Sequence, residues 1–281
     1  MNQLAPVAAV AFWGALASAV AGAESDPYVI GMTVRGGGGC PMIVWSLFHG
    51  SPAERAGVKV GDHLVAIDGT PTQQMDAREA SLKIRSEAPG MVRLAMSRGL
   101  QRYQVSIERE PRSAVIAQTG YKEDRGHVVP SNATTAEVAA IESFDGSRIV
   151  SRVFPLHYPS NTDCYSGAFE LFLLKEPSEV AVGGIEPGPG ARAGLHWGDR
   201  ILEVNGATIT GKAPTEVESL FCTQTRQRLD LVVQRGETIR HITLTTSKTA
   251  DLLRANGMTF MGTSLVPLAV AAADVRCLEQ K

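Results

Sequence analysis

Several motifs of catalytic and metal-binding sites are missing from this 281-residue chain. It contains no His-Glu-x-x-His motif of zinc metalloproteases and no Cys-x-x-Cys pair, and its six histidines show no metal-ligand spacing. The glycine run Gly36–Gly39 lacks the lysine of a phosphate loop, so we interpret it as a flexible connection between strands. We therefore expect no metal and no cofactor.

A basic surface is missing as well. The formal net charge is −2, and the chain has neither a run of lysines nor a basic amphipathic helix. Proteins that bind nucleic acid usually carry a basic stripe, and helices that lie on membranes usually carry a basic face. These absences argue against nucleic acid and against a membrane surface as partners.

Basic side chains are also missing from the N-terminal segment, whose first ten residues contain neither Lys nor Arg, so its positive charge rests on the amino terminus alone. Leu4–Val20 is nevertheless almost wholly apolar or small, and Ala21-Gly22-Ala23 matches a cleavage site. The apolar stretch is shorter than the roughly 20 residues that a membrane span needs. It predicts a cleaved signal peptide and a periplasmic or secreted protein without a stable span; an uncleaved anchor and a misassigned start codon are the alternatives.

Four cysteines are present, and they are widely spaced: Cys40, Cys164, Cys222 and Cys277. An even number of cysteines in an oxidising compartment favours disulfides, with free buried thiols as the alternative.

Two stretches of the chain share one pattern of turn-forming residues. The first, Ser51–Gly69, reads SPAERAGVKVGDHLVAIDG, and the second, Gly188–Gly206, reads GPGARAGLHWGDRILEVNG. Each predicts a short helix that ends at a glycine, a Gly-Asp turn and a strand closed by a second turn. The second stretch follows the first by 137 positions without a gap. An ungapped match at such positions predicts one fold used twice.

This pattern resembles the PDZ family, in the form common in bacterial envelope proteins. The motif S-P-A-x-x-A-G-(x)3-G-D-x-(I/L)-(x)2-(I/V)-(D/N)-G is complete in the first stretch, whereas Gly188 and Gly190 replace its serine and alanine in the second. The resemblance implies an α+β, mostly β fold with two PDZ-like small barrels, each of five to six strands and two helices, and a structured linker. The expected parts are a signal peptide at residues 1–23, a first module at 24–110, a linker or hairpin segment at 111–165, a second module at 166–247 and a C-terminal tail at 248–281.

The resemblance also implies a peptide-binding strand in the first module. In the family, a Φ-G-Φ core precedes this strand, and its backbone N–H groups face the terminal carboxylate of a peptide. Ile30-Gly31-Met32 matches the core, and Thr33-Val34 continues the strand. A plain edge strand with one glycine is the alternative.

A helix forms the second wall of the peptide groove in the family. Asp76 can cap a helix that runs to about Arg85, and Ala77, Ser81 and Ile84 fall on one face of it. For Ile84 alone, a place in the core is the better interpretation.

The second module departs from the family pattern. Phe169-Glu170-Leu171 takes the place of the Φ-G-Φ core, and a carboxylate at Glu170 would repel a terminal carboxylate unless it points away. Val217 and Phe221 are apolar groove or core positions on the expected helix. We expect this module to bind C-termini weakly or not at all.

The segment between the modules supports two interpretations. Val138–Phe144 and Ile149–Phe154 flank Asp145-Gly146, which predicts a hairpin. Thr134-x-x-Glu137 resembles a capping box, which would start a helix instead. The hairpin is favoured, either as a linker with its own structure or as an elaborate first strand of the second module. The apolar C-terminal tail is expected to pack on one module.

The resemblance places one disulfide between Cys164 and Cys222, because an end of the groove helix is expected near the start of the groove strand. Cys40 and Cys277 are then left over, and their pairing would dock the tail onto the glycine run.

No catalytic domain is evident. His127, Asp145 and Ser166 occur in the order of a trypsin-like triad, but fewer than sixty residues separate the modules, too few for two catalytic barrels. The chain is therefore predicted not to be an enzyme. It is expected to be a non-catalytic exported protein that binds C-termini or extended strands of envelope proteins by strand addition. The alternatives are a protease or protease-accessory subunit of the envelope, and an assembly whose grooves are occupied internally.

Overall fold

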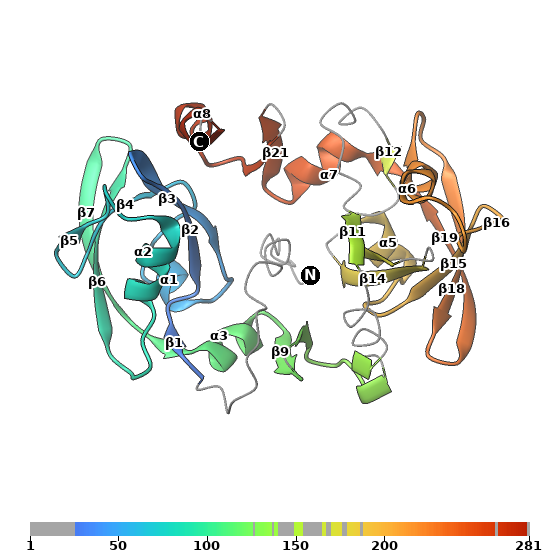
Figure 1. The fold of residues 1–281 in the computed structure, drawn as a ribbon, viewed down its shortest axis with the longest axis horizontal. Helices are drawn as coiled ribbons and strands as arrows, with labels where there is room; N and C mark the ends of the chain where they lie inside the picture. The colour runs from blue at the N-terminus through green and yellow to red at the C-terminus, as the bar shows by residue number, and fades with distance from the viewer. Residues whose placement is uncertain are drawn as a thin grey trace, which may run out of the picture. The chain divides into compact units, whose positions relative to one another are not determined.

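The computed structural model describes residues 26–125, 127–136, 138–139, 149–153, 165–166, 170–175, 179–185, 188–261 and 264–279. The described chain forms two compact units, each built around one module (Figure 1). The unit of the first module extends to residue 131 and also includes the C-terminal residues from Leu265 onward. The unit of the second module comprises residues 132–264. The predicted signal peptide lies outside the described residues.

The first module is an antiparallel sheet with the strand order β2-β3-β4-β6-β7, and β5 pairs with β4. Its elements are β1 (Tyr28–Val29), β2 (Met32–Gly37), β3 (Cys40–Leu47), α1 (Pro52–Arg55), β4 (His63–Ile67), β5 (Thr70–Pro71), α2 (Ala77–Ile84), β6 (Met91–Arg98) and β7 (Gln101–Glu108). Alternation builds the core: in β6, Val92, Leu94 and Met96 are buried between more exposed neighbours. The α+β, mostly β fold predicted from the sequence is confirmed.

The second module repeats this sheet and adds one strand. Its strand order is β11-β13-β14-β15-β18-β19, with β16 paired to β15. The elements are β11 (Ile149–Val153), β12 (Tyr165–Ser166), β13 (Glu170–Lys175), β14 (Glu179–Ile185), α5 (Pro189–Ala193), β15 (Arg200–Val204), β16 (Ala207–Thr208), α6 (Pro214–Phe221), β17 (Cys222–Thr223), β18 (Arg228–Arg235) and β19 (Thr238–Thr245). The additional strand is β11, which lies at the edge of the sheet beside β13.

The internal repeat is longer than the sequence motif indicates. After the first module come β8 (Glu110–Pro111), α3 (Arg112–Gln118), β9 (Tyr121–Asp124) and β10 (His127–Pro130). After the second come β20 (Ser247–Lys248), α7 (Thr249–Ala255), β21 (Met258–Met261) and β22 (Ser264–Pro267). Each of the later elements begins 137 positions after its counterpart. The residues expected to be linker and tail thus begin with matching extensions of the two modules, a helix followed by a two-stranded sheet.

The hairpin predicted across Asp145-Gly146 is wrong at the start of its first strand, where Val138 and Ala139 are described. Val138 has helical backbone, and its N–H donates to the carbonyl of Thr134, as the competing capping-box interpretation predicted. Ile149–Val153 is a strand, but it pairs with β13 and thus forms an added first strand of the second module. The Asp145-Gly146 turn itself lies outside the described residues.

Contrary to expectation, the C-terminal tail does not pack on a single module: residues from Leu265 onward belong to the unit of the first module, whereas residues 248–264 belong to the unit of the second. Its last helix, α8 (Ala272–Glu279), lies beside β3, although the two are far apart in the sequence (Figure 1). Cys277 is disulfide-bonded to Cys40, with the two α-carbons 5.8 Å apart, and His63 Nε2 lies 2.8 Å from Asp274 Oδ2. The expected pairing of Cys40 with Cys277 is confirmed. Among the described residues, no helix is long and apolar enough to cross a membrane.

Candidate peptide-binding site

The strand of the predicted peptide site is β2, an edge strand of the first sheet. Met32 pairs with Leu47 and Thr33 with Ser46 of β3, and the hydroxyls of Thr33 and Ser46 lie 2.6 Å apart. Within the part of the chain that the structure describes, β3 is the only strand that pairs with β2. An edge strand of this kind can accept another strand through its backbone.

Helix α2 is connected by the backbone to both ends of this strand region. At one end, Tyr28 and Ser86 exchange two backbone hydrogen bonds of 2.7 and 3.0 Å. At the other end, the Gly38 N–H donates to the Met75 carbonyl at 3.3 Å, directly before the N-cap residue Asp76. The Asp76 carboxylate accepts from the Glu79 N–H at 2.7 Å. These bonds fix the distance between α2 and β2.

Arg109 holds the C-terminal end of α2. Its Nε donates to the Ile84 carbonyl at 2.6 Å, and its Nη1 donates to the Met91 carbonyl at 2.8 Å. A cation is favourable here because the last carbonyls of a helix lack partners within the helix and carry partial negative charge. Arg109 therefore positions the helix that the family resemblance assigns to the second wall of the site.

The residues predicted to bind peptide in the first module differ in burial. Ile30, Val34 and Ile84 belong to the hydrophobic core, with exposures of 1%, 8% and 6%. Met32, Thr33 and Ala77 are half-buried, and Ser81 is exposed. The accessible part of the predicted site is therefore made by half-buried and exposed residues of β2 and α2 above a core of Ile30, Val34 and Ile84.

Gly31 is required by packing inside the module. Its φ is +70°, and a Cβ atom there would lie 2.4 Å from Cβ of Ser51 and 2.9 Å from Cγ1 of Val115. Ser51 is the N-cap of α1, and its hydroxyl accepts from the Glu54 N–H at 3.3 Å. Packing therefore requires glycine at this position of the Φ-G-Φ core, independently of the approach of a carboxylate.

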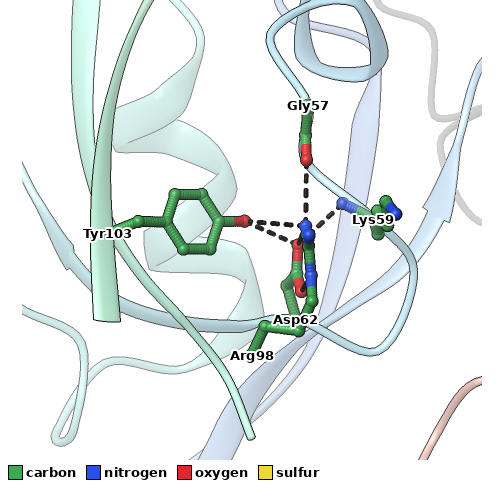
Figure 2. Close-up of polar contacts among 5 residues, drawn as sticks. All are labelled: Gly57, Lys59, Asp62, Arg98 and Tyr103. Carbon is green, nitrogen blue, oxygen red and sulfur yellow. Dashed lines mark hydrogen bonds and ion pairs between the residues drawn. The ribbon is translucent and has the colours of Figure 1, made fainter. Parts of the chain in front are cut away.

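A buried carboxylate fixes the turn before β4 (Figure 2). Asp62 is 1% exposed and accepts hydrogen bonds from Arg98 Nε at 2.7 Å, the Tyr103 hydroxyl at 2.6 Å and the Lys59 N–H at 2.7 Å. The Arg98 guanidinium also donates to the second carboxylate oxygen at 2.8 Å and to the Gly57 carbonyl at 2.9 Å. One charged pair therefore joins the end of α1, the turn before β4 and the β6–β7 hairpin.

This environment shifts three pKa values. Burial alone would raise the pKa of Asp62, but the hydrogen bonds from Arg98, Tyr103 and the Lys59 N–H outweigh it and lower the pKa. The bond to Asp62 raises the pKa of Arg98. Burial, followed by the bond to the Asp62 carboxylate, raises the pKa of Tyr103 to about 12. The carboxylate is therefore ionised and the phenol neutral at neutral pH.

The second module contains the same pair without the phenol. Asp199 is fully buried and accepts from Arg235 at 2.7 and 2.8 Å, from Nε and Nη2 respectively, and from the His196 N–H at 2.9 Å. Arg235 also donates to the Gly194 carbonyl at 2.7 Å. Arg240 occupies the position that corresponds to Tyr103. The second module therefore provides an internal control for the contribution of the phenol.

Comparison with protein families accounts for this repeated architecture. A PDZ domain model matches residues 49–95, and a second PDZ domain model matches residues 172–234. The chain contains two PDZ domains. The first and second modules are therefore called the first and second PDZ domains, and PDZ domains bind the C-termini of peptides.

The relatives of these PDZ domains include two regulatory cofactors. The chain is 25% identical over 187 residues to the Na(+)/H(+) exchange regulatory cofactor NHE-RF4 of Mus musculus, covering 64% of this chain and 36% of the relative. It is 28% identical over 200 residues to NHE-RF1 of Gallus gallus, covering 69% and 54%. The chain thus spans between about a third and a half of the length of these relatives. Among solved structures, the photosystem II D1 C-terminal processing protease matches with 24% identity and a TM-score of 0.30, over 32% of this chain and 25% of that one.

The predicted site of the second PDZ domain is described in part. Val217 and Phe221 are core residues, 0% and 2% exposed, which is one of the two roles that the sequence allows them. Leu171 lies in β13, where it pairs with Gly184. Phe169 and the predicted Cys164–Cys222 bond lie outside the described residues, although the backbone register pairs Ser166 with Cys222.

Sequence reasoning missed the roles of Arg98 and Arg109. Arg98-Gly99 and Arg235-Gly236 lie 137 positions apart and suggested only hairpin turns. The arginine before the glycine in both repeats was a signal for the paired Asp62 and Asp199. Arg109 has no such signal, because Thr246 stands at the corresponding position. Of the three residues in triad order, Asp145 lies outside the described residues and Ser166 lies in the short strand β12.

Proposed function

We propose that this chain is a non-catalytic, exported peptide-binding protein whose first PDZ domain takes up the C-terminal segment of an envelope protein as a strand beside β2. This proposal rests on one observation: β2 is an edge strand at Met32–Val34 and lies beside α2. Backbone hydrogen bonds near both ends of α2 fix the position of that helix relative to the strand. Backbone bonding along β2 would supply affinity, and the apolar Met32 and Ala77 favour an apolar last residue. We expect roughly micromolar binding, about −8 kcal/mol.

Fluorescence anisotropy with the full chain tests this proposal. The probe is a labelled decapeptide with a free C-terminal Val, Leu or Phe, compared with the same peptide ending in a carboxamide. Ser81→Trp should weaken binding at least about tenfold, because Ser81 is exposed on the helix face that carries Ala77 and Ile84. Lys83→Trp is the matched control, because this exposed residue lies on a different face of α2. Equal binding by Ser81→Trp and the unsubstituted chain would exclude the β2–α2 site.

The non-catalytic part of the proposal has its own test. The purified chain should not hydrolyse casein or unfolded peptides, because the sequence leaves no room for a catalytic domain beside the two PDZ domains. Turnover that survives purification and is lost in Ser166→Ala would contradict it.

Export is supported by the signal-like N-terminus and by the Cys40–Cys277 bond, since disulfides persist mainly in oxidising compartments. Mass spectrometry of the protein isolated from its own cells should find an N-terminus near Glu24. An intact Met1 in a cytosolic fraction with reduced Cys40 would rule export out.

A further inference from the structure

In the second PDZ domain, the position of a bound peptide is taken by the chain itself. β13 corresponds to β2, because each pairs with the strand that precedes the repeated motif. On its other edge β13 pairs with β11, with Arg152 opposite Leu173 and Val153 opposite Phe172. Among the described residues of the first PDZ domain, no strand lies at the corresponding edge of β2.

β11 also has the direction expected of a bound peptide. It is antiparallel to β13, and its C-terminal residue Val153 lies toward Glu170, the residue that replaces the glycine of the Φ-G-Φ core. Helix α6, the counterpart of α2, contacts β11. β11 therefore lies between a strand and a helix in the arrangement proposed for the partner peptide of the first PDZ domain.

Two residues that differ between the PDZ domains are compatible with a ligand that has no free carboxylate in the second domain. The first PDZ domain has Gly31 and Ser51, whereas the second has Glu170 and Gly188 at the corresponding positions. A Cβ atom at Gly31 would lie 2.4 Å from Cβ of Ser51, and Gly188 has no such atom. One of the contacts that exclude a side chain at Gly31 is therefore absent at Gly188 in the second PDZ domain. Since the chain continues beyond Val153, β11 brings no terminal carboxylate to Glu170.

We propose that Ile149–Val153 is an internal ligand of the second PDZ domain. The domain recognises an internal strand of this chain rather than a C-terminus, and it is closed to peptides in solution while β11 is bound. A tethered ligand competes at an effective concentration on the order of millimolar, which is far above micromolar peptide. This inference rests on the strand-addition mode proposed above.

The experiment compares three full chains that all carry Ser81→Trp, so that binding of the probe by the first PDZ domain is weakened equally in all three. One has no further change, one has Ser151→Pro with Arg152→Pro, and the matched control has Ser151→Ala with Arg152→Ala. The N–H groups of successive strand residues point to opposite edges of the strand, and proline has no N–H group. Substituting both Ser151 and Arg152 by proline therefore removes one N–H group that faces β13. The probe is a labelled peptide of residues 147–156 with a C-terminal carboxamide. We expect the proline variant to bind it at least about tenfold more tightly than the other two.

Amide hydrogen exchange of the unsubstituted chain provides a second measurement that needs no variant. The outward amides of β13 should be protected, and those of Met32–Val34 in β2 should exchange faster. Equal probe binding by all three chains would overturn the proposal, as would a proline variant that keeps β18 protected but does not bind. If the proline variant unfolds, unprotected β13 amides in the unsubstituted chain would overturn the proposal by themselves. The probe lacks a carboxylate, so failure of C-terminal binding by the first PDZ domain is a separate result.

Discussion

Tyr103 donates a hydrogen bond of 2.6 Å to the carboxylate of Asp62, and this bond has no equivalent at Arg240 in the second PDZ domain. The two domains share the buried Asp–Arg pair, so the phenol is an addition to a common framework. A hydrogen bond to a charged group typically contributes about 1.5–3 kcal/mol. The first PDZ domain therefore carries a contribution to stability that can be titrated separately.

Titration of Tyr103 should be delayed to high pH. Its pKa is raised from the ordinary tyrosine value of 10.0 to about 12 in the folded chain, so the contribution is fully present below pH 10 and is lost as the pH rises to about 12. Phenolate absorbance should show a titration step at a pH of about 12, and Tyr103→Phe should remove that step. A titration curve unchanged by Tyr103→Phe would contradict the assignment.

The contact between Gly31 and Ser51 predicts a coupled pair of substitutions. Gly31→Ala should destabilise the first PDZ domain, because φ is +70° and the new Cβ meets that of Ser51. Ser51→Gly removes the opposing Cβ and costs only a few tenths of a kcal/mol as an N-cap change. In urea unfolding, the double variant should be more stable than the sum of the single effects predicts, by about 0.5 kcal/mol or more. Strict additivity would show that the clash is relieved elsewhere.

Removing the Cys40–Cys277 bond should loosen the tail. Substitution of both cysteines by serine should lower the free energy of unfolding of the first unit by about 2–4 kcal/mol. Limited trypsin digestion should then cleave after Arg276, which lies in α8. Substitution of Cys164 and Cys222 is the control and should leave this site protected. Unchanged protection in the Cys40–Cys277 double variant would show that α8 docks without the bond.

Arg109 should matter for both the helix and the peptide. Arg109→Met removes the donors to the Ile84 and Met91 carbonyls and should cost about 1–2 kcal/mol in stability while weakening the binding of a C-terminal peptide. Arg78→Met, on an exposed position of the same helix, is the control. If both variants bind equally well, α2 does not depend on this cap.

The motif determined how much of the fold could be predicted. Between Ser51 and Gly69 the predicted helix, turns and strand are present, because capping and turn residues act within a few positions. The predicted helix after Asp76 is also present, as α2. The helix and two-stranded sheet that follow each module were not predicted as a repeat, because the two copies share few residues. Gly120, Val129 and Pro130 are among these few, and they match Gly257, Val266 and Pro267.

The segment before the second PDZ domain shows where local signals fail. Asp145-Gly146 predicts a hairpin, yet β11 pairs with β13, a strand that lies farther along the chain than any turn signal reaches. Pairing between strands distant in sequence depends on which edge strand of the folded domain is accessible, and local turn residues do not specify it. In the same way, packing decides that Val217 and Phe221 face the core, which their helical spacing alone leaves open.

The bond between Cys40 and Cys277 closes most of the chain into a covalent ring. The whole second unit, residues 132–264, lies inside that ring. A single proteolytic cut at any peptide bond between the two cysteines therefore opens the ring without releasing a fragment. At least two cuts, or one cut together with a reductant, are needed to separate the second PDZ domain from the first.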